Sequence, residues 1–168
     1  MKHSGYIKAI IIVVLLILLD RWTKHLASTF LAPDADGIPL IPGVFRLLYL
    51  ENRGSAFGMM QNRQTFLILF TFVILASVTY VFVKIPAGDR RMAPLRASII
   101  LIYAGAVGNL IDRISQRFVV DFFYFELIDF PIFNVADIYV TCGAILLVFL
   151  LLFRYKDEDL AFLKQHNK

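Results

Sequence analysis

The chain of 168 residues contains one cysteine, Cys142, and three histidines. An intramolecular disulfide is therefore impossible, and a cysteine-based metal cluster is not available. His3 and His166 lie near the two ends of the chain, and no H-x-x-E-H or related zinc-protease pattern occurs. A glycine-rich phosphate loop is also missing. Cys142 lies inside an apolar run, where a small apolar filler of a helix face is its simplest interpretation.

Charged residues make up only 18% of the chain. Hydrophobic residues make up 59%, and the mean hydropathy is +0.72. A soluble domain is usually about half apolar. The excess is organised into long runs, which indicates helices that span a bilayer. A formal charge of +4 in a soluble protein would hint at a nucleic-acid partner. Here membrane orientation explains the charge better, and no nucleic-acid partner is expected.

Four apolar runs are each near the ~20 residues that a helix needs to cross a bilayer. A membrane-spanning segment must satisfy its own backbone groups, which favours helices. The sequence therefore predicts an all-α integral membrane protein, with residues 1–168 forming a single membrane-embedded domain. The predicted helices cover residues 6–26, 65–83, 95–111 and 137–153, and the predicted outer loops cover residues 31–64 and 112–136.

Basic residues cluster on one side of this four-helix chain, in the two termini and in the loop between the second and third helices. By the positive-inside rule, both termini are cytoplasmic. The site-bearing loops then face the outside of a bacterial cytoplasmic (inner) membrane. The first run resembles a signal peptide, but it continues into charged residues without a convincing cleavage site, so its removal is disfavoured. The basic residues on the cytoplasmic side are Lys2, Lys8, Lys84, Arg90, Arg91, Arg96, Arg154, Lys156, Lys164 and Lys168.

The first outer loop combines turn formers with a strand-like run. Pro33, Gly37 and Pro42 are among its turn formers. Residues 44–50 are β-prone, and small and polar residues follow them at 51–58. This composition predicts a short extracytoplasmic sheet lying on the membrane surface.

Asp20 and Lys24 are four residues apart on the first predicted helix, so they share a face and can form an ion pair. At an exposed helix end such a pair stabilises little. In the interior of the bundle it would matter more, because an unpaired charge there is costly. We interpret the pair as a structural brace.

Asn109, Asp112 and Arg113 occupy positions i, i+3 and i+4 at the outer end of the third predicted helix and therefore line one face. Gly105 and Gly108 make that end thin, as expected where membrane helices pack closely. Arg113 has two open interpretations. Its guanidinium can bind a carbonyl-bearing or acidic substrate, or it can extend to the lipid headgroups.

Asn134 and Asp137 have the spacing of a helix capping box, which alone could account for both residues. A carboxylate at a helix N-terminus is also favoured in its ionised form. Asp121 lies between valines and phenylalanines, and such an environment raises a carboxyl pKa. Two carboxyl groups in different environments can share a proton and activate one water. A metal held by Asp112, Asp121 and Asp137 remains open from spacing alone.

Five motifs in the same order give the chain a family resemblance: it resembles lipoprotein signal peptidase (signal peptidase II), a bacterial inner-membrane aspartyl protease. One departure is the run Arg53-Gly54-Ser55, which is bulkier and more basic than is usual in that family and affects detailed substrate preference. The matching pieces are Asp20…Lys24, Asn52-x-Gly54-x-Ala56-Phe57, Gly108-Asn109-x-x-Asp112-Arg113, Val120-Asp121-Phe122 and Phe133-Asn134-x-Ala136-Asp137.

The resemblance implies that Asp121 and Asp137 form the catalytic dyad and that no cofactor is needed. It also implies a substrate, a prolipoprotein whose cysteine carries diacylglycerol and which is cut just before that cysteine. Sensitivity to the cyclic peptide globomycin is implied as well. The implied substrate-binding residues are Asn52, Gly54, Asn109, Arg113 and Asn134, and the implied supporting residues are Asp20, Lys24 and Asp112.

Three alternatives make different predictions. A small transporter with Asp20, Asp112 and Asp137 as a proton relay would need ionisable groups through the whole membrane depth. A metal-dependent lipid transferase would lose activity in chelator. A non-enzymatic scaffold would tolerate Asp121→Asn and Asp137→Asn.

Overall fold

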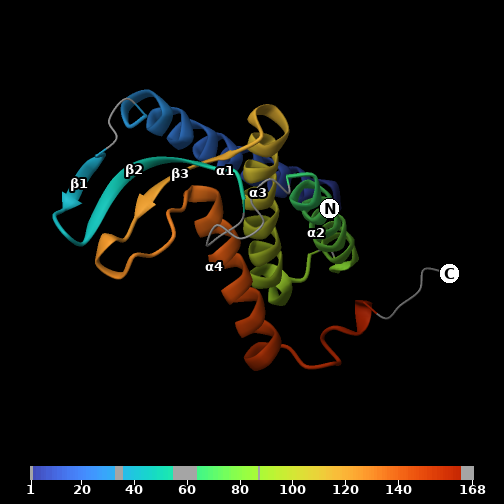
Figure 1. Cartoon of the computed structure of the whole chain (residues 1–168). Helices are drawn as coiled ribbons and strands as arrows, with labels where there is room; N and C mark the ends of the chain where they lie inside the picture. The colour runs from blue at the N-terminus through green and yellow to red at the C-terminus, as the bar shows by residue number, and fades with distance from the viewer. Residues whose placement is uncertain (1, 33–35, 55–63, 87, 164–168) are drawn as a thin grey trace.

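A computed structural model describes residues 2–32, 36–54, 64–86 and 88–163 (Figure 1). Four long helices contain most of these residues, and a small sheet lies beside their ends. Short 3-10 turns are η2 (Arg90–Met92), η3 (Glu126–Ile128) and η5 (Ala161–Leu163), and one π turn is η4 (Leu150–Arg154). The helices are α1 (Lys2–Phe30), α2 (Gln64–Lys84), α3 (Ala93–Gln116) and α4 (Val135–Phe149).

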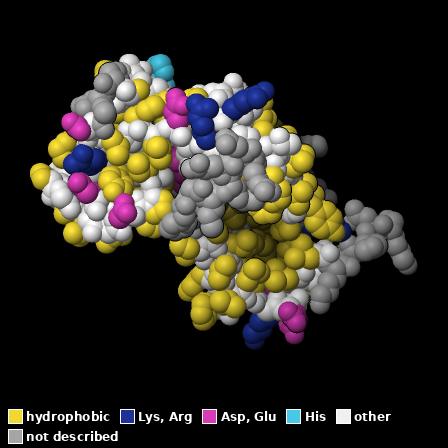
Figure 2. Space-filling model, in the orientation of Figure 1, with side chains coloured by type: hydrophobic (Ala, Val, Ile, Leu, Met, Phe, Trp, Pro, Cys, Tyr) yellow, Lys and Arg dark blue, Asp and Glu magenta, His cyan; other side chains and the backbone are white. Residues whose placement is uncertain are grey.

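Three segments of the described chain are long and apolar enough to cross a membrane. They are Gln64–Lys84, Arg90–Gln116 and Val135–Arg154. A 21-residue helix is roughly 31 Å long, which matches the hydrocarbon core of a bilayer. In Figure 2, charged side chains gather at the two ends of the visible face, and hydrophobic side chains cover the zone between them. The protein is therefore a mostly helical membrane protein.

The helices begin and end differently from the prediction. The predicted third helix, 95–111, is too short, because α3 continues to Gln116 and places Asp112 and Arg113 inside the helix rather than in an outer loop. Asp112 is fully buried there and contacts Arg21 and Lys24 of α1, so a partner helix stabilises this polar turn. α1 is also longer than predicted at both ends. α4 begins two residues early, at Val135, and a π turn replaces its predicted last turn.

The segments between α1 and α2 and between α3 and α4 form a three-stranded antiparallel sheet in the order β1-β2-β3. β1 is Ile38–Ile41, β2 is Phe45–Asn52 and β3 is Val119–Tyr124. β2 confirms the strand expected near residues 44–50, whereas β3 was not predicted. The sheet lies to one side of the helices, between the C-terminal end of α1 and the N-terminal end of α4 (Figure 1).

α3 lies centrally and contacts α1, α2 and α4 (Figure 1). Its glycines make these contacts close, as predicted. A Cβ at Gly105 would lie 2.3 Å from the Ala136 carbonyl oxygen of α4, and one at Gly108 would lie 2.6 Å from Asp20 Oδ2 of α1. Both positions exclude a side chain, so α3 brings α1 and the start of α4 together.

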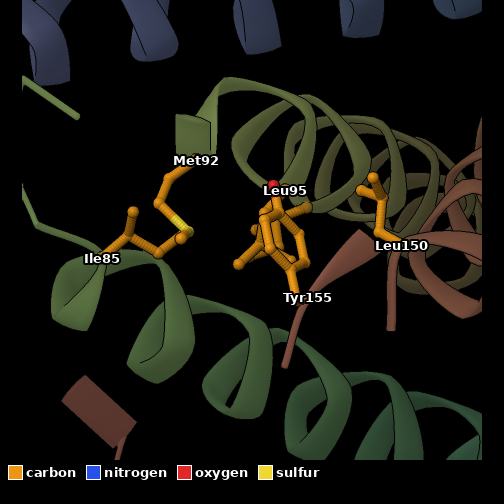
Figure 3. Close-up of a cluster of buried hydrophobic side chains, with 6 residues drawn as sticks. Ile85, Met92, Leu95, Leu150 and Tyr155 are labelled. Carbon is orange, nitrogen blue, oxygen red and sulfur yellow. The ribbon is translucent and has the colours of Figure 1, made fainter. Parts of the chain in front are cut away.

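Two clusters of buried apolar side chains pack neighbouring elements together. One joins the α2–α3 connection to the π turn through Ile85, Met92, Leu95, Leu150 and Tyr155 (Figure 3). The other packs the sheet on α1, through Ala27 and Leu31 of α1 against Val120 and Phe122 of β3. The second cluster fixes β3 beside the C-terminal end of α1.

Candidate active site

β3 carries Asp121 into the interior by strand alternation. Val120 and Phe122 pack toward α1, whereas Val119 and Asp121 line a cavity on the opposite face of the strand. Asp121 is only 1% exposed. Its Oδ2 accepts a hydrogen bond from Asn52 Nδ2 of β2 at 2.8 Å, and its Oδ1 accepts one from Asn134 Nδ2 at 2.6 Å. Two amides from different elements therefore hold this carboxyl group.

Burial and the nearby charge of Asp137 together raise the pKa of Asp121 to about 7. The two amide hydrogen bonds and the positive charge of Lys24 act in the opposite direction on this pKa. Burial outweighs them because an ionised carboxylate loses its hydration in an apolar setting. At neutral pH, Asp121 can therefore either donate or accept a proton.

Asp137 lies in the first turn of α4 and takes part in the predicted capping box. Asn134 Oδ1 accepts a hydrogen bond from the Asp137 N–H at 3.0 Å, and Asp137 Oδ2 accepts one from the Asn134 N–H at 3.1 Å. Asp137 Oδ1 accepts a further bond from Asn109 Nδ2 of α3 at 2.7 Å. The start of α4 is therefore part of the site, because its N-cap residue, Asn134, contacts both Asp121 and Asp137.

A short return segment explains how residues 121 and 137 come together. After η3 the chain turns back, and Phe133 pairs with Phe123 of β3 through hydrogen bonds of 2.8 Å and 3.0 Å. This pairing places Asn134 beside Asp121 and starts α4 there. The sequence analysis missed the pairing because a single residue bridge leaves no periodic pattern.

Asp121 and Asp137 line the same cavity, which has a volume of about 410 Å³. Most of the remaining lining is apolar. One wall comes from α4, at positions i+1, i+3, i+4 and i+5 from Asp137. These wall residues were not predicted as part of the site, although their helical spacing from Asp137 could have indicated them. The cavity is lined by Asn52, Asn109, Arg113, Val119, Asp121, Phe130, Pro131, Ile132, Phe133, Asp137, Ile138, Val140, Thr141 and Cys142.

Two further predicted site residues, Arg113 and Gly54, lie in or beside the cavity lining. Arg113 lines it, and its buried Nε has no hydrogen-bond partner among the described residues. Gly54 is buried and donates its N–H to Asn52 Oδ1 at 3.0 Å, which orients the Asn52 amide toward Asp121. Ala56 and Phe57, which belong to the same motif, lie outside the described residues. Cys142 is exposed and lines the cavity, so its interpretation as a packed filler is wrong.

The predicted supporting residues form a buried charge cluster behind the site. Lys24 Nζ lies 2.9 Å from both Asp20 Oδ2 and Asp112 Oδ2, and it donates a hydrogen bond to Asn109 Oδ1 at 2.8 Å. Asp20 and Lys24 therefore form the predicted brace, inside the bundle rather than at an exposed helix end. Asp20 Oδ1 also accepts the N–H of Ala136 in α4 at 3.0 Å. These carboxylates meet at the start of α4 instead of extending through the membrane depth, which does not favour a proton relay.

The described residues contain no group of three His, Cys, Asp or Glu side chains arranged to hold a metal ion. Asp112, one member of the metal set left open by its spacing, contacts Arg21 and Lys24 instead. The cavity brings together two carboxyl groups and a guanidinium in an apolar setting. Such a set can activate water for attack on a carbonyl carbon.

Comparisons with known proteins identify the family of the chain. The family model described as "Signal peptidase (SPase) II" matches residues 12–153, a range that includes every candidate site residue. The chain belongs to the signal peptidase II family. It is therefore a membrane peptidase of the aspartic type.

Curated relatives in this family carry the name lipoprotein signal peptidase. The protein from Caldanaerobacter subterraneus is 42% identical over 147 residues, covering 87% of this chain and 97% of the relative. The protein from Clostridium tetani is 46% identical over 154 residues, covering 89% and 96%.

The fold is also found among solved structures. A bacterial membrane enzyme determined by the in meso method at 2.3 Å resolution has a TM-score of 0.76 and 30% identity, covering 96% of this chain and 94% of that chain. A second such structure, at 1.9 Å resolution, has a TM-score of 0.75 and 33% identity, covering 88% of this chain and 94% of that one.

Proposed function

We propose that this signal peptidase II family member cleaves diacylglyceryl-modified prolipoproteins just before the lipid-bearing cysteine, with Asp121 and Asp137 as its catalytic pair. The observation that carries the proposal is that these two carboxyl groups line one cavity at the start of α4. The names of the relatives support the substrate class. A lipid-anchored substrate keeps its scissile bond near the headgroups, at the level where a helix that crosses the membrane begins.

In the proposed mechanism, Asp121 begins protonated and Asp137 begins ionised. The raised pKa of Asp121, about 7, supports the first assignment. The position of Asp137 at a helix N-terminus supports the second. A water bound between the two attacks the scissile carbonyl carbon and gives a proton to Asp137, while Asp121 protonates the carbonyl oxygen.

The resulting diol then breaks down. Asp121 takes a proton back from a diol hydroxyl as the carbonyl re-forms. Asp137 gives its proton to the departing nitrogen, and the C–N bond breaks. Both residues return to their starting states, and the net reaction consumes one water. Holding water and peptide together in a largely dry cavity removes several kcal/mol of the entropic barrier.

The geometry supports two kinds of substrate-binding role. Arg113 lines the cavity, and its buried Nε has no partner in the described part of the chain, so its guanidinium is placed to bind backbone carbonyls of the substrate. Gly54 follows β2 and donates its N–H to Asn52 Oδ1, so its proposed contribution acts through Asn52. The amides of Asn52, Asn109 and Asn134 already bind the aspartates, so their proposed contribution to substrate binding is to keep the carboxyl groups in place.

We propose that α1 is the fourth membrane-spanning helix. Its 29 residues suffice in length, and its buried ion pairs neutralise the charges it carries. Both termini are then cytoplasmic in a bacterial inner membrane, and the site lies near the outer leaflet in contact with lipid. The basic residues between α2 and α3 and after α4 support this orientation. Globomycin is expected to block the same cavity.

The proposal predicts a basic limb in the pH–rate profile near pH 7, because activity needs the proton on Asp121. The Asn52 amide lowers the pKa of Asp121 by binding its ionised form. Asn52→Ala is therefore expected to move the basic limb to higher pH, in addition to lowering the maximal rate. Initial rates of the purified protein measured across neutral pH check this. A basic limb that stays in place in the variant would contradict the assignment of the proton to Asp121.

Cleavage of a purified diacylglyceryl-modified prolipoprotein tests the proposed function directly. The expected result is a cut on the N-terminal side of the modified cysteine, at the same rate with and without chelator. The same precursor without its lipid is the matched control, and it is expected to be cleaved far more slowly. Equal cleavage of both precursors would remove the lipid from the proposed specificity, and loss of activity in chelator would point to a metal enzyme.

A further inference from the structure

Lys24 is a lysine with 1% exposure inside the helical bundle. Three polar atoms lie within 2.9 Å of its ammonium group. Two are carboxylate oxygens of Asp20 and Asp112 at 2.9 Å, and the third is the amide oxygen of Asn109 at 2.8 Å. The two aspartates offset the cost of burying the charge. The contact with Asn109 links this charge to the catalytic pair.

The oxygen and the nitrogen of the Asn109 side-chain amide bind different kinds of group. Its Oδ1 accepts hydrogen bonds from Lys24 Nζ and, at 3.2 Å, from Asn134 Nδ2. Its Nδ2 donates to Asp137 Oδ1 at 2.7 Å. Turned over, the amide would place its NH2 group against an ammonium that can only donate, and its oxygen against a carboxylate. Lys24 therefore allows only one orientation.

We propose that Lys24 is a positioning residue of the peptidase, which fixes the orientation of the Asn109 amide and thereby holds Asp137 and Asn134 in their reactive arrangement. Asn134 passes the constraint to Asp121 through its own amide at 2.6 Å. One buried cation on α1 thus reaches both catalytic carboxyl groups through two amides. This inference rests on the proposed roles of Asp121 and Asp137.

A purely structural role is the alternative, and Arg21 provides the matched control. Both Arg21 and Lys24 contact Asp112 in this charge cluster, but of these two cations only Lys24 makes a described hydrogen bond to Asn109. Arg21 is also part-exposed and lies outside the cavity lining. If the cluster only stabilises the fold, Lys24→Gln and Arg21→Gln should act alike on activity once their stabilities are matched.

The pH profile provides a second readout. The ionisable groups that act on Asp121 are Asp137 of α4, Lys24 of α1 and Arg113 of α3, whereas β2 presents the neutral Asn52. The positive charge of Lys24 lowers the pKa of Asp121, so Lys24→Gln should raise it. The basic limb of the rate profile should then move to higher pH.

The test compares Lys24→Gln, Arg21→Gln and the charge-balanced double variant Lys24→Gln/Asp112→Asn in the full-length protein, with diacylglyceryl-modified prolipoprotein as substrate. Lys24→Gln is expected to lower kcat on the order of 10²-fold with little change in KM and to shift the basic limb upward. Arg21→Gln should leave kcat and the limb within about twofold of the parent protein. If Lys24→Gln alone does not fold, the double variant tests the same loss of the ammonium group, because a glutamine amide can donate or accept.

Normal turnover in a folded variant that lacks Lys24 would overturn the inference, and so would an equal loss in Arg21→Gln. An unmoved basic limb would also overturn it. Failure of the proposed catalytic pair gives a different result from failure of the Lys24 role. In the first case, Asp121→Asn and Asp137→Asn would keep their turnover. If those variants are inactive while Lys24→Gln is active, only the positioning role is wrong.

Discussion

Asp137→Asn and Asp121→Asn are each expected to lower cleavage of a diacylglyceryl-modified prolipoprotein by about 10³-fold or more. Asparagine keeps the shape of the side chain but cannot exchange a proton, and general acid–base catalysis contributes typically 10²–10⁴-fold. Each proposed step uses both residues, so the loss should appear in kcat rather than in KM. Single-turnover cleavage by the purified protein measures it.

Asp129→Asn is the matched control for these variants. Asp129 also lies in the segment between β3 and α4, where it accepts a hydrogen bond from the Tyr124 hydroxyl at 2.7 Å, but it does not line the cavity. Asparagine tolerates its left-handed backbone conformation, with φ of 47°. Turnover within about twofold of the parent protein is expected. If either Asp121→Asn or Asp137→Asn behaves like this control, that residue is not part of the mechanism.

Asn134→Ala is the second substitution with a large expected effect, because the Asn134 side chain contacts both halves of the site. It donates to Asp121 Oδ1 and to Asn109 Oδ1, and it accepts from the Asp137 N–H. Alanine removes an N-cap worth about 1 kcal/mol. It also leaves buried polar partners unsatisfied, at about 1–3 kcal/mol. A fall in kcat on the order of 10²-fold and a lower thermal unfolding temperature should follow.

Asn134→Ser separates the two contributions. Serine is a good N-cap and can still accept from the backbone of α4, but its side chain is too short to reach Asp121. The unfolding temperature should therefore lie near that of the parent protein while kcat stays low. A serine variant that recovers both properties would reduce Asn134 to a helix cap, as the capping-box interpretation of the sequence alone allows.

The long apolar runs made the helices predictable from the sequence, but not all of their ends. α2 lies within one residue of its predicted range at each end, because nearly every residue between them is apolar. α3 extends five residues beyond its predicted end, through the polar positions Asp112, Ser115 and Gln116. Those residues remain helical because Arg21 and Lys24 arrive from α1 to pair with Asp112. A contact between residues 91 positions apart leaves no local signal.

β3 could not be predicted from alternation because both of its faces are covered. Val119, Val120, Asp121 and Phe122 are all buried, so the usual polar–apolar pattern is missing. Its partner β2 lies about 70 residues away in the chain, and its other described backbone pairing is with the single residue Phe133. The sheet itself was expected from the β-prone run that became β2.

The residues of the site could be predicted from the sequence, but the hydrogen bonds between them could not. Polar residues in such an apolar chain indicated a site, and the family motifs selected Asp121 and Asp137 among them. Which amide binds which carboxyl group depends on side chains from α1, α3, α4 and β2 meeting at one point. Sequence spacing carries no information about the orientation of the Asn109 amide, because Lys24 sets it from another helix.

The central claim is that the two carboxyl groups in the cavity hold one proton between them before the reaction, and that Asp121 carries it. Difference infrared spectroscopy of the carboxyl stretch tests it most directly, at about one pH unit below the pKa of about 7. The account predicts a protonated carboxyl band that titrates near pH 7, disappears in Asp121→Asn and is retained in Asp129→Asn. A band that persists unchanged in Asp121→Asn, or a parent protein without any such band, would contradict the account.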